Sequence, residues 1–149
     1  MSDRPAASSS VIRRRMQATP RRDTLCELAL RSAVHRLGLR FRVDWQLPGT
    51  RRRADLAFIG ARVAVFVDGC FWHSCPIHAT KPRANAAWWR RKLAMNARRD
   101  WDTNLQLQQQ NWLVLRFWEH EKAERAAEAI GKALLRRRGL SKRRARARR

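Results

Sequence analysis

The sequence predicts an α/β domain of three layers, in which helices flank a small mixed β-sheet. Apolar residues recur at helical spacing in three segments, about 21–37, 86–110 and 121–137. Strand-like patterns occupy four short segments, 41–47, 54–59, 62–68 and 112–118. Because a helical segment separates the last two strands, we expect them to be parallel and joined by a right-handed crossover.

The first helix is indicated by apolar residues at helical spacing, namely Leu25, Leu28, Ala29, Ala33 and Leu37. Thr19-Pro20 or Asp23-Thr24 could begin it, since Thr and Asp side chains cap helix N-termini. Gly38 is a natural end, because glycine readily adopts the left-handed conformation that follows many helices. Cys26 lies on the apolar side of this helix and is expected to be a small core residue.

The next three strands are separated by turn residues. Phe41 to Leu47 alternates apolar and polar residues, as a half-buried strand does, and Pro48-Gly49 then turns the chain. A second strand, 54–59, is connected tightly by Gly60-Ala61 to 62–68. This third run is almost wholly apolar, so we expect a central strand that is covered on both faces.

The remaining segments complete the predicted organisation. An irregular loop, 70–85, precedes the long helix, and the fourth strand and the last helix follow it. Residues 1–16 are polar and basic and are expected to be a disordered arm. The Arg-rich tail, 139–149, is expected to be unfolded without a partner. A single domain is therefore predicted over 17–138.

The chain is strongly basic. Its 149 residues include 34 Lys and Arg against 12 Asp and Glu, a formal net charge of +22. This charge favours a polyanionic partner, with nucleic acid ahead of an anionic membrane surface, although a merely solvated basic surface is the alternative. Neither a membrane-spanning apolar run nor a secretory apolar segment is present, so we expect a cytoplasmic protein that associates with the nucleoid when bound to DNA.

The loop after the third strand contains the densest chemistry. Cys70, Cys75 and His78 have C-x4-C-x2-H spacing, and such soft or borderline ligands suit tetrahedral Zn²⁺. His120, just after the fourth strand, is the best remote candidate for a fourth ligand. A structural zinc would fix the loop to the end of that strand. The alternative is two buried thiols with incidental histidines.

Several carboxylates could hold a catalytic Mg²⁺, which suits phosphodiester hydrolysis because it neutralises charge and positions water. Asp55 begins the second strand and Asp68 ends the third, so hairpin pairing would bring them near one sheet edge, similar to the arrangement in restriction-type nucleases. His73 follows Asp68 closely and could position or deprotonate water. Asp100 on the long helix and Glu27 on the first helix are further candidates. Ordinary salt bridges on a basic protein are the alternative.

Two adjacent aromatic residues, Phe71 and Trp72, lie beside the predicted zinc ligands. Bulky side chains in such a loop can insert between bases and kink a duplex. Trp88 and Trp89 open the long helix, and at least one of them should face the core. The alternative is that the loop aromatics fold back on the core.

These motifs, taken in order, resemble the very-short-patch repair (Vsr) endonucleases over about residues 12–135. The resemblance rests on Leu47-Pro48-Gly49 with Ala54-Asp55, on the stretch from Val65 to His73 that contains GCFWH, and on NARRD at 96–100, WLVL at 112–115 and Trp118-Glu119. It implies a restriction-endonuclease-like fold and a Mg²⁺-dependent nick 5′ of the thymine in a T:G mismatch. Such mismatches arise from 5-methylcytosine deamination. The resemblance therefore implies double-stranded DNA as the partner and a functional link to a cytosine-5 DNA methyltransferase.

The resemblance also assigns roles by position. Asp55 would be the principal Mg²⁺ ligand, with the backbone carbonyl of Val67 as a second. His73 and Asp100 would hold either the phosphate or water molecules bound to the metal. Glu27 matches a glutamate of the family's first helix. The remaining assignments are intercalating aromatics at Phe71, Trp72 and Trp89, and zinc on Cys70, Cys75, His78 and His120. A monomer is expected, with mismatch-repair or polymerase proteins as further functional partners.

Three departures from the family pattern affect these expectations. Asp68 stands where a histidine is familiar; it could bind Mg²⁺ but cannot act as an imidazole. His120 stands where cysteine is familiar, and imidazole is an acceptable zinc ligand. The turn Thr50–Arg53 is longer and more basic than usual and could add phosphate contacts or shift Asp55. The alternatives to a T:G nickase are a catalytically inactive, zinc-stapled DNA-binding module and a related nuclease with another mismatch or structure specificity.

Overall fold

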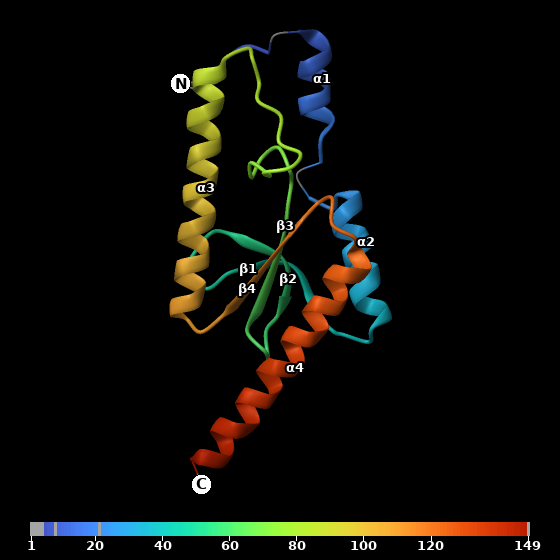
Figure 1. The fold of residues 1–149 in the computed structure, drawn as a ribbon, viewed down its shortest axis with the longest axis vertical. Helices are drawn as coiled ribbons and strands as arrows, with labels where there is room; N and C mark the ends of the chain where they lie inside the picture. Colours follow the sequence, from blue (N-terminus) through green and yellow to red (C-terminus); the bar gives the residue numbers. More distant parts are fainter. Residues whose placement is uncertain (1–4, 8, 21, 149) are drawn as a thin grey trace.

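The computed structural model describes residues 5–7, 9–20 and 22–148, and in this part of the chain helices flank a four-stranded sheet (Figure 1). The helices are α1 (Ser10–Ala18), α2 (Leu25–Arg36), α3 (Ala86–Gln109) and α4 (Ala123–Ala147). The strands are β1 (Arg42–Gln46), β2 (Arg53–Phe58), β3 (Val63–Asp68) and β4 (Leu113–Trp118). The predicted order of elements from β1 to β4 is confirmed.

The sheet has the strand order β1-β2-β3-β4 and is mixed. β1 pairs antiparallel with β2, and β2 pairs antiparallel with β3, with Leu56 opposite Val65. β3 and β4 are parallel over their whole lengths, from Val63↔Leu113 to Asp68↔Trp118. The predicted meander and parallel crossover are therefore confirmed, and the carboxyl ends of β3 and β4 emerge side by side.

The two faces of the sheet are covered by different helices, as Figure 1 shows. On one face, α2 and α4 pack on β2 and β3 through buried residues that include Leu30, Val34, Ile130, Leu56 and Val65. On the other face, the C-terminal end of α3 covers a smaller cluster that includes Leu107, Ala64 and Phe66. These layers follow from the apolar runs of β3, since both faces of this strand are buried.

Helix α2 begins and ends where its local sequence favours it. The Thr24 hydroxyl accepts a hydrogen bond from the Glu27 backbone N–H, so the second of the two predicted starts is correct. Gly38 has a φ of 72° and its N–H donates to the His35 carbonyl. Glycine adopts this left-handed conformation at little cost, which explains the stop.

The terminal segments differ from the predicted disorder. Residues 10–18 form α1, with the Ser9 hydroxyl accepting from the Ile12 N–H, and α4 continues to Ala147 rather than ending near residue 137. The physical reason is propensity: Arg, Ala and Leu are strong helix formers, and no proline interrupts the tail. Residues 1–4, 8 and 149 of the predicted arm and tail lie outside the described residues.

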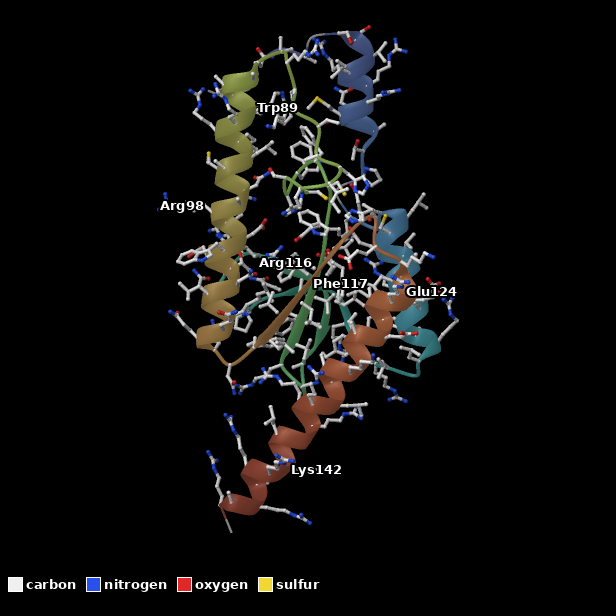
Figure 2. The ribbon with its side chains drawn as sticks, in the orientation of Figure 1. Trp89, Arg98, Arg116, Phe117, Glu124 and Lys142 are labelled. Carbon is white, nitrogen blue, oxygen red and sulfur yellow. The ribbon has the colours of Figure 1, made fainter. Side chains whose placement is uncertain are left out.

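The far end of α4 projects from the body of the molecule, with Lys142 on its exposed part (Figure 2). Among the residues that the structure describes, no helix is long and apolar enough to cross a membrane.

Candidate active site and metal cluster

A groove of about 990 Å³ opens at the end of the sheet where β3 leads into the loop 69–85. Its walls come from the end of α1, the start of α2, the loop and the N-terminal half of α3. Most of the predicted catalytic and aromatic residues line it, including Glu27, Val67, Phe71, His73 and Trp89. Val67 of β3 and Glu119 after β4 complete the lining, so segments far apart in the sequence contribute to one concave surface.

Asp55 is fixed at the point where β2 and β3 separate. The described pairing of these strands runs from Phe58↔Val63 to Leu56↔Val65. Beyond it, the Val67 backbone N–H donates to Asp55 Oδ2 at 2.6 Å, so a side-chain oxygen replaces the carbonyl of the partner strand. This bond holds the carboxylate of Asp55 beside the backbone of Val67. These are the two residues that the resemblance assigns as Mg²⁺ ligands.

Asp55 is an unusually basic carboxylate. Its pKa is raised to about 6, chiefly by burial. The charges of Glu27 and Asp68 contribute to this rise, while the hydrogen bond from Val67 and the charge of Arg31 oppose it. The pKa of an aspartate is about 4 in water. A site where one carboxylate is held at this cost among other acids favours a bound cation.

Glu27 lies on the first turn of α2 and is 6% exposed. Its Oε2 accepts from the Asp23 backbone N–H at 2.8 Å and from Arg31 Nη2 at 3.5 Å. The carboxylate therefore belongs to the wall of the groove with one backbone donor and one cationic partner. Its charge also acts on Asp55.

His73 is held by Asp100. His73 Nδ1 lies 2.5 Å from Asp100 Oδ2, and an ionised carboxylate can only accept, so the ring donates from Nδ1. Asn96, one turn earlier on α3, donates from Nδ2 to the Trp72 carbonyl at 3.1 Å. Asn96 and Asp100 thus fix two consecutive loop residues against one face of α3. In the neutral ring, Nε2 is left as the proton acceptor.

Asp68 ends β3, as predicted, and is 7% exposed. Its Oδ1 accepts from Arg116 Nη1 at 2.8 Å, and it lies 3.8 Å from His73 Nδ1. Arg116 Nη2 is 3.6 Å from Asp100 Oδ1. The structure therefore brings Asp68, His73 and Asp100 together, with an arginine between the two carboxylates.

The aromatic residues form one cluster at the other end of the groove. Phe71 lies 5.2 Å from Trp72 and 5.1 Å from Trp89 between ring centroids, both edge to face. Trp88 packs edge to face on Trp89 at 4.8 Å. The Trp72 side of the cluster reaches the surface, since this residue is 39% exposed. The cluster contains the three predicted intercalating residues and adds Trp88, which had no predicted role.

The four predicted zinc ligands converge. One ligand atom from each of Cys70, Cys75, His78 and His120 lies within 4.8 Å of all the others. The nitrogens of His78 and His120 are 3.2 Å apart, and the sulfur–nitrogen distances are 3.1 Å for Cys70–His120 and 3.9 Å for Cys75–His120 and Cys75–His78. Tetrahedral zinc with ordinary bond lengths would separate two nitrogens by about 3.3 Å and sulfur from nitrogen by about 3.6 Å. This donor set fits such an ion.

The two thiols differ in acidity. The pKa of Cys70 is raised to about 11, chiefly by burial and in addition by the neighbouring Cys75 and Glu119. Burial also opposes ionisation of Cys75, but the backbone N–H groups of His78 and Ile77 outweigh it and lower its pKa. Deprotonation on metal binding would therefore be easier at Cys75 than at Cys70.

Two residues with important contacts were given no role by the sequence. Arg116 interrupts an otherwise apolar strand, and this break in pattern was the available signal. Glu119 Oε1 accepts from the Cys70 backbone N–H at 2.7 Å and so links β4 to the metal-cluster loop. In the sequence, Glu119 stood out only through its position beside His120 and its place in the Trp118-Glu119 motif of the resemblance.

The basic turn 50–53 has a structural use. Arg52 donates to the Arg99 carbonyl at 2.8 Å and to Asp102 at 3.1 Å, and also contacts Thr103, all on α3. Arg53 pairs with Asp44 at 2.9 Å. Only Arg51 among the three arginines has no such described partner; Arg52 anchors the turn to α3, and Arg53 anchors it to β1.

The carboxylates that were predicted to be catalytic do not form a tight metal cage. In the described part of the chain, the Cys/His cluster is the one group of three or more potential ligands at metal-binding separation. Mg²⁺ does not need such a cage, because it keeps several waters and uses one or two carboxylates together with substrate phosphate. The hydrogen-bonded Asp55–Val67 pair, surrounded by further acids, fits that pattern.

Comparison with known proteins identifies relatives that match most of this chain. A family model described as DNA mismatch endonuclease Vsr matches residues 8–78. The type II nicking enzyme V.NaeI of Lentzea aerocolonigenes is 43% identical over 129 residues, which cover 85% of this chain and 78% of that protein. The DNA mismatch endonuclease Vsr of Escherichia coli K12 is 38% identical over 106 residues, which cover 70% of this chain and 66% of that protein. The type II nicking enzyme V.NmeDIP of Neisseria meningitidis serogroup C is 36% identical, over 85% of this chain and 88% of that protein.

Proposed function

Because this chain belongs to the Vsr family of DNA mismatch endonucleases, we propose that it nicks one strand of duplex DNA 5′ of the thymine in a T:G mismatch, in a Mg²⁺-dependent reaction. The family makes it a DNA endonuclease; the mismatch and the metal are the proposed details. Relatives named as nicking enzymes support cleavage of a single strand. The layered sheet supports the restriction-endonuclease-like fold that the resemblance implied.

The observation that carries the proposal is the position of His73, which Asp100 holds, in the groove that is also lined by Val67, whose N–H binds Asp55. In the proposed reaction, Asp55 and the Val67 carbonyl hold the cation, and Glu27 adds negative charge nearby. When bound, Mg²⁺ supplies the positive charge that neutralises the phosphate and the departing 3′-oxygen. His73 accepts a proton from the attacking water at Nε2, while Asp100 stabilises the charged ring.

Zinc is the proposed occupant of the Cys70, Cys75, His78 and His120 cluster. It would have no chemical part in cleavage. Its proposed role is to fix the loop that carries His73 and Phe71 to the end of β4. The Cys70 N–H bond to Glu119 supports the same connection from the protein side.

The test is a nicking assay on end-labelled duplexes that differ only in one T:G or T:A pair, with Mg²⁺ present or replaced by EDTA. We expect one cut, 5′ of the mismatched thymine, and no cut in T:A or with EDTA. Tight mismatch binding without cleavage would instead favour an inactive DNA-binding module. Cleavage of other mismatches or of branched DNA in preference to T:G would favour a related nuclease.

The exposed aromatic cluster leads to a separate prediction. Phe71→Ala combined with Trp72→Ala removes the two loop aromatics that line the groove and should reduce the T:G over T:A binding preference by about tenfold or more, since wedge residues compensate for unstacking. Affinity for undamaged duplex should change less, because it rests on the protein's charge. Competition binding measures both. Trp101→Ala, which removes a 65% exposed tryptophan of α3 outside this cluster, is the control; equal loss on both duplexes would contradict the wedge role.

The proposed biological setting follows from the substrate. T:G mismatches arise where 5-methylcytosine loses its amino group, so a cytosine-5 DNA methyltransferase is the proposed functional partner. Mismatch-repair or polymerase proteins would act on the nicked product. We propose that the enzyme itself acts as a monomer on double-stranded DNA.

A further inference from the structure

Arg116 lies between Asp68 and Asp100 and engages three side chains through three different nitrogens, two by hydrogen bonds and one by an ion pair. Its Nε donates to Asn104 Oδ1 at 3.0 Å and its Nη1 to Asp68 Oδ1 at 2.8 Å, and Nη2 lies 3.6 Å from Asp100 Oδ1. The guanidinium also lies over the Phe66 ring, 4.4 Å from its centroid. A planar guanidinium with all sides engaged is fixed in position far better than a lysine could be.

The placement of Arg116 explains how the chain tolerates Asp68. This carboxylate is 7% exposed and lies near Asp55 and Asp100, so without a cation it would be an unpaired buried charge among like charges. Arg116 neutralises it from the adjacent strand, since the register pairs Phe66 with Arg116 on parallel β3 and β4. Figure 2 shows Arg116 on the α3 side of β4, opposite to the side of Phe117.

Asp100 connects the Asp68–Arg116 pair to His73, the proposed general base. One oxygen of Asp100 faces Arg116 Nη2 and the other accepts from His73 Nδ1. The orientation of the Asp100 carboxylate therefore determines both the ring plane of His73 and the nitrogen that carries the proton. Among the described residues no partner is found for His73 Nε2, which is thus the nitrogen available to substrate or water.

We propose that Arg116, anchored by Asp68, is a positioning residue for strand nicking, which through Asp100 holds His73 in the orientation and tautomer that leave Nε2 as proton acceptor. On this basis, Asp68 serves the reaction as the anchor of Arg116. The inference rests on the proposed function of His73, and it adds two residues from β3 and β4 that act without touching the substrate.

The first test is single-turnover nicking of T:G duplex at saturating enzyme, together with the dissociation constant for the same duplex. Arg116→Met and Asp68→Asn should each slow nicking by about 100-fold, the usual effect of a misplaced catalytic group. Binding should change less than about threefold, because neither residue is in the proposed aromatic wedge. Arg116→Lys should recover less than tenfold, since it restores charge but not the three-way geometry. Arg36→Met, which removes a 60% exposed arginine side chain of α2, is the matched control.

A double variant shows whether Asp68 and Arg116 act on the nicking rate together or independently. If Asp68 acts only through Arg116, then Asp68→Asn combined with Arg116→Met should be no slower than the slower single variant. Multiplying effects, full recovery with Arg116→Lys, or single variants within threefold of the parent rate would each overturn the proposal. Bound metal and thermal unfolding of every variant show whether a loss comes from misfolding.

A second readout separates this inference from the proposed function. Long-range proton–nitrogen NMR spectra report the tautomer of each imidazole, and with four histidines in the chain a His73→Gln variant assigns the relevant signals. The parent protein should show the proton of neutral His73 on Nδ1, and Arg116→Met should mix the tautomers. This result would support positioning even if the parent protein failed to nick T:G duplex. An unchanged tautomer in Arg116→Met would refute it even if nicking were lost.

Discussion

Asp55→Asn should abolish nicking, with a loss of at least about 1,000-fold in the single-turnover rate constant, while binding to T:G duplex persists. An amide oxygen can still accept from the Val67 N–H, which Asp55 does at 2.6 Å, so the local fold is expected to survive. The amide lacks the charge that holds a divalent cation, and a group that acts on transition-state charge is expected to contribute several kcal/mol. Gel assays of nicking and of binding measure the two effects separately.

Asp44→Asn is the matched control for this variant. Asp44 lies on the adjacent strand β1, where it pairs with Arg22 and Arg53 on the surface. Asparagine tolerates its positive φ of 48°. Nicking by Asp44→Asn should stay within about threefold of the parent. Full activity in Asp55→Asn, or equal losses in the two variants, would remove Asp55 from the metal site.

Asp55→Asn should also stabilise the metal-free fold at neutral pH. Because the folded-state pKa of Asp55 is raised to about 6 from 3.8, the ionised carboxylate destabilises the native protein above pH 6. The penalty is at most about 3 kcal/mol, and it disappears as the pH falls through 6 towards 4 and the group binds a proton. Chemical unfolding in EDTA should therefore favour Asp55→Asn at pH 8 and show little difference at pH 4. A destabilised variant at pH 8 would contradict the raised pKa.

Loss of the Cys/His cluster should reduce nicking about as much as Asp55→Asn does, but through disorder of the loop. Cys75→Ser removes one of the four converging ligands, and we expect the purified variant to lose its single equivalent of zinc. Binding of a structural zinc is worth about 10 kcal/mol or more in small domains, which is comparable to the whole stability of an ordinary domain. The loop would then lose its order and misplace His73, Phe71 and Trp72 together, with nicking reduced by at least about 1,000-fold.

Metal analysis and a thermal melt check this prediction, with Cys26→Ser as the control. Cys26 is also a free thiol, but it lies on α2 and outside the cluster. The sheet core on α2 and α4 does not include the cluster, so Cys75→Ser should keep much of its helical signal. A parent protein that contains no zinc, or a zinc-free variant that nicks at the parent rate, would rule out the structural role.

The sequence by itself determined the strand order in the chain, the helix α3 between β3 and β4, and the identity of the converging ligands. Periodicity fixes which segments are strands and helices, and a parallel crossover follows from their order. The spacing of Cys70, Cys75 and His78 is a local property, so their meeting could be predicted. His120 could be added because the ends of parallel strands lie at one sheet edge.

The terminal helices show where reasoning from charge composition and from local helix preference disagreed. Charge composition predicted disorder for 1–16 and 139–149, yet α1 and the end of α4 contain strong helix formers and a Ser9 cap. In these segments the local preference for helix was the better guide, since a basic helix keeps its charged side chains in solvent and needs no large core.

Only the tertiary structure decided how Asp68 is used. From the sequence it was a carboxylate on one strand and Arg116 an interruption on another, and nothing local relates residues 48 positions apart. The parallel register of β3 and β4 places them on one face, and the packing of α3 brings Asp100 and Asn104 to the same guanidinium. Pairing of charges across elements depends on register and helix placement, which long-range packing sets; the family pattern could only flag Asp68 as a departure.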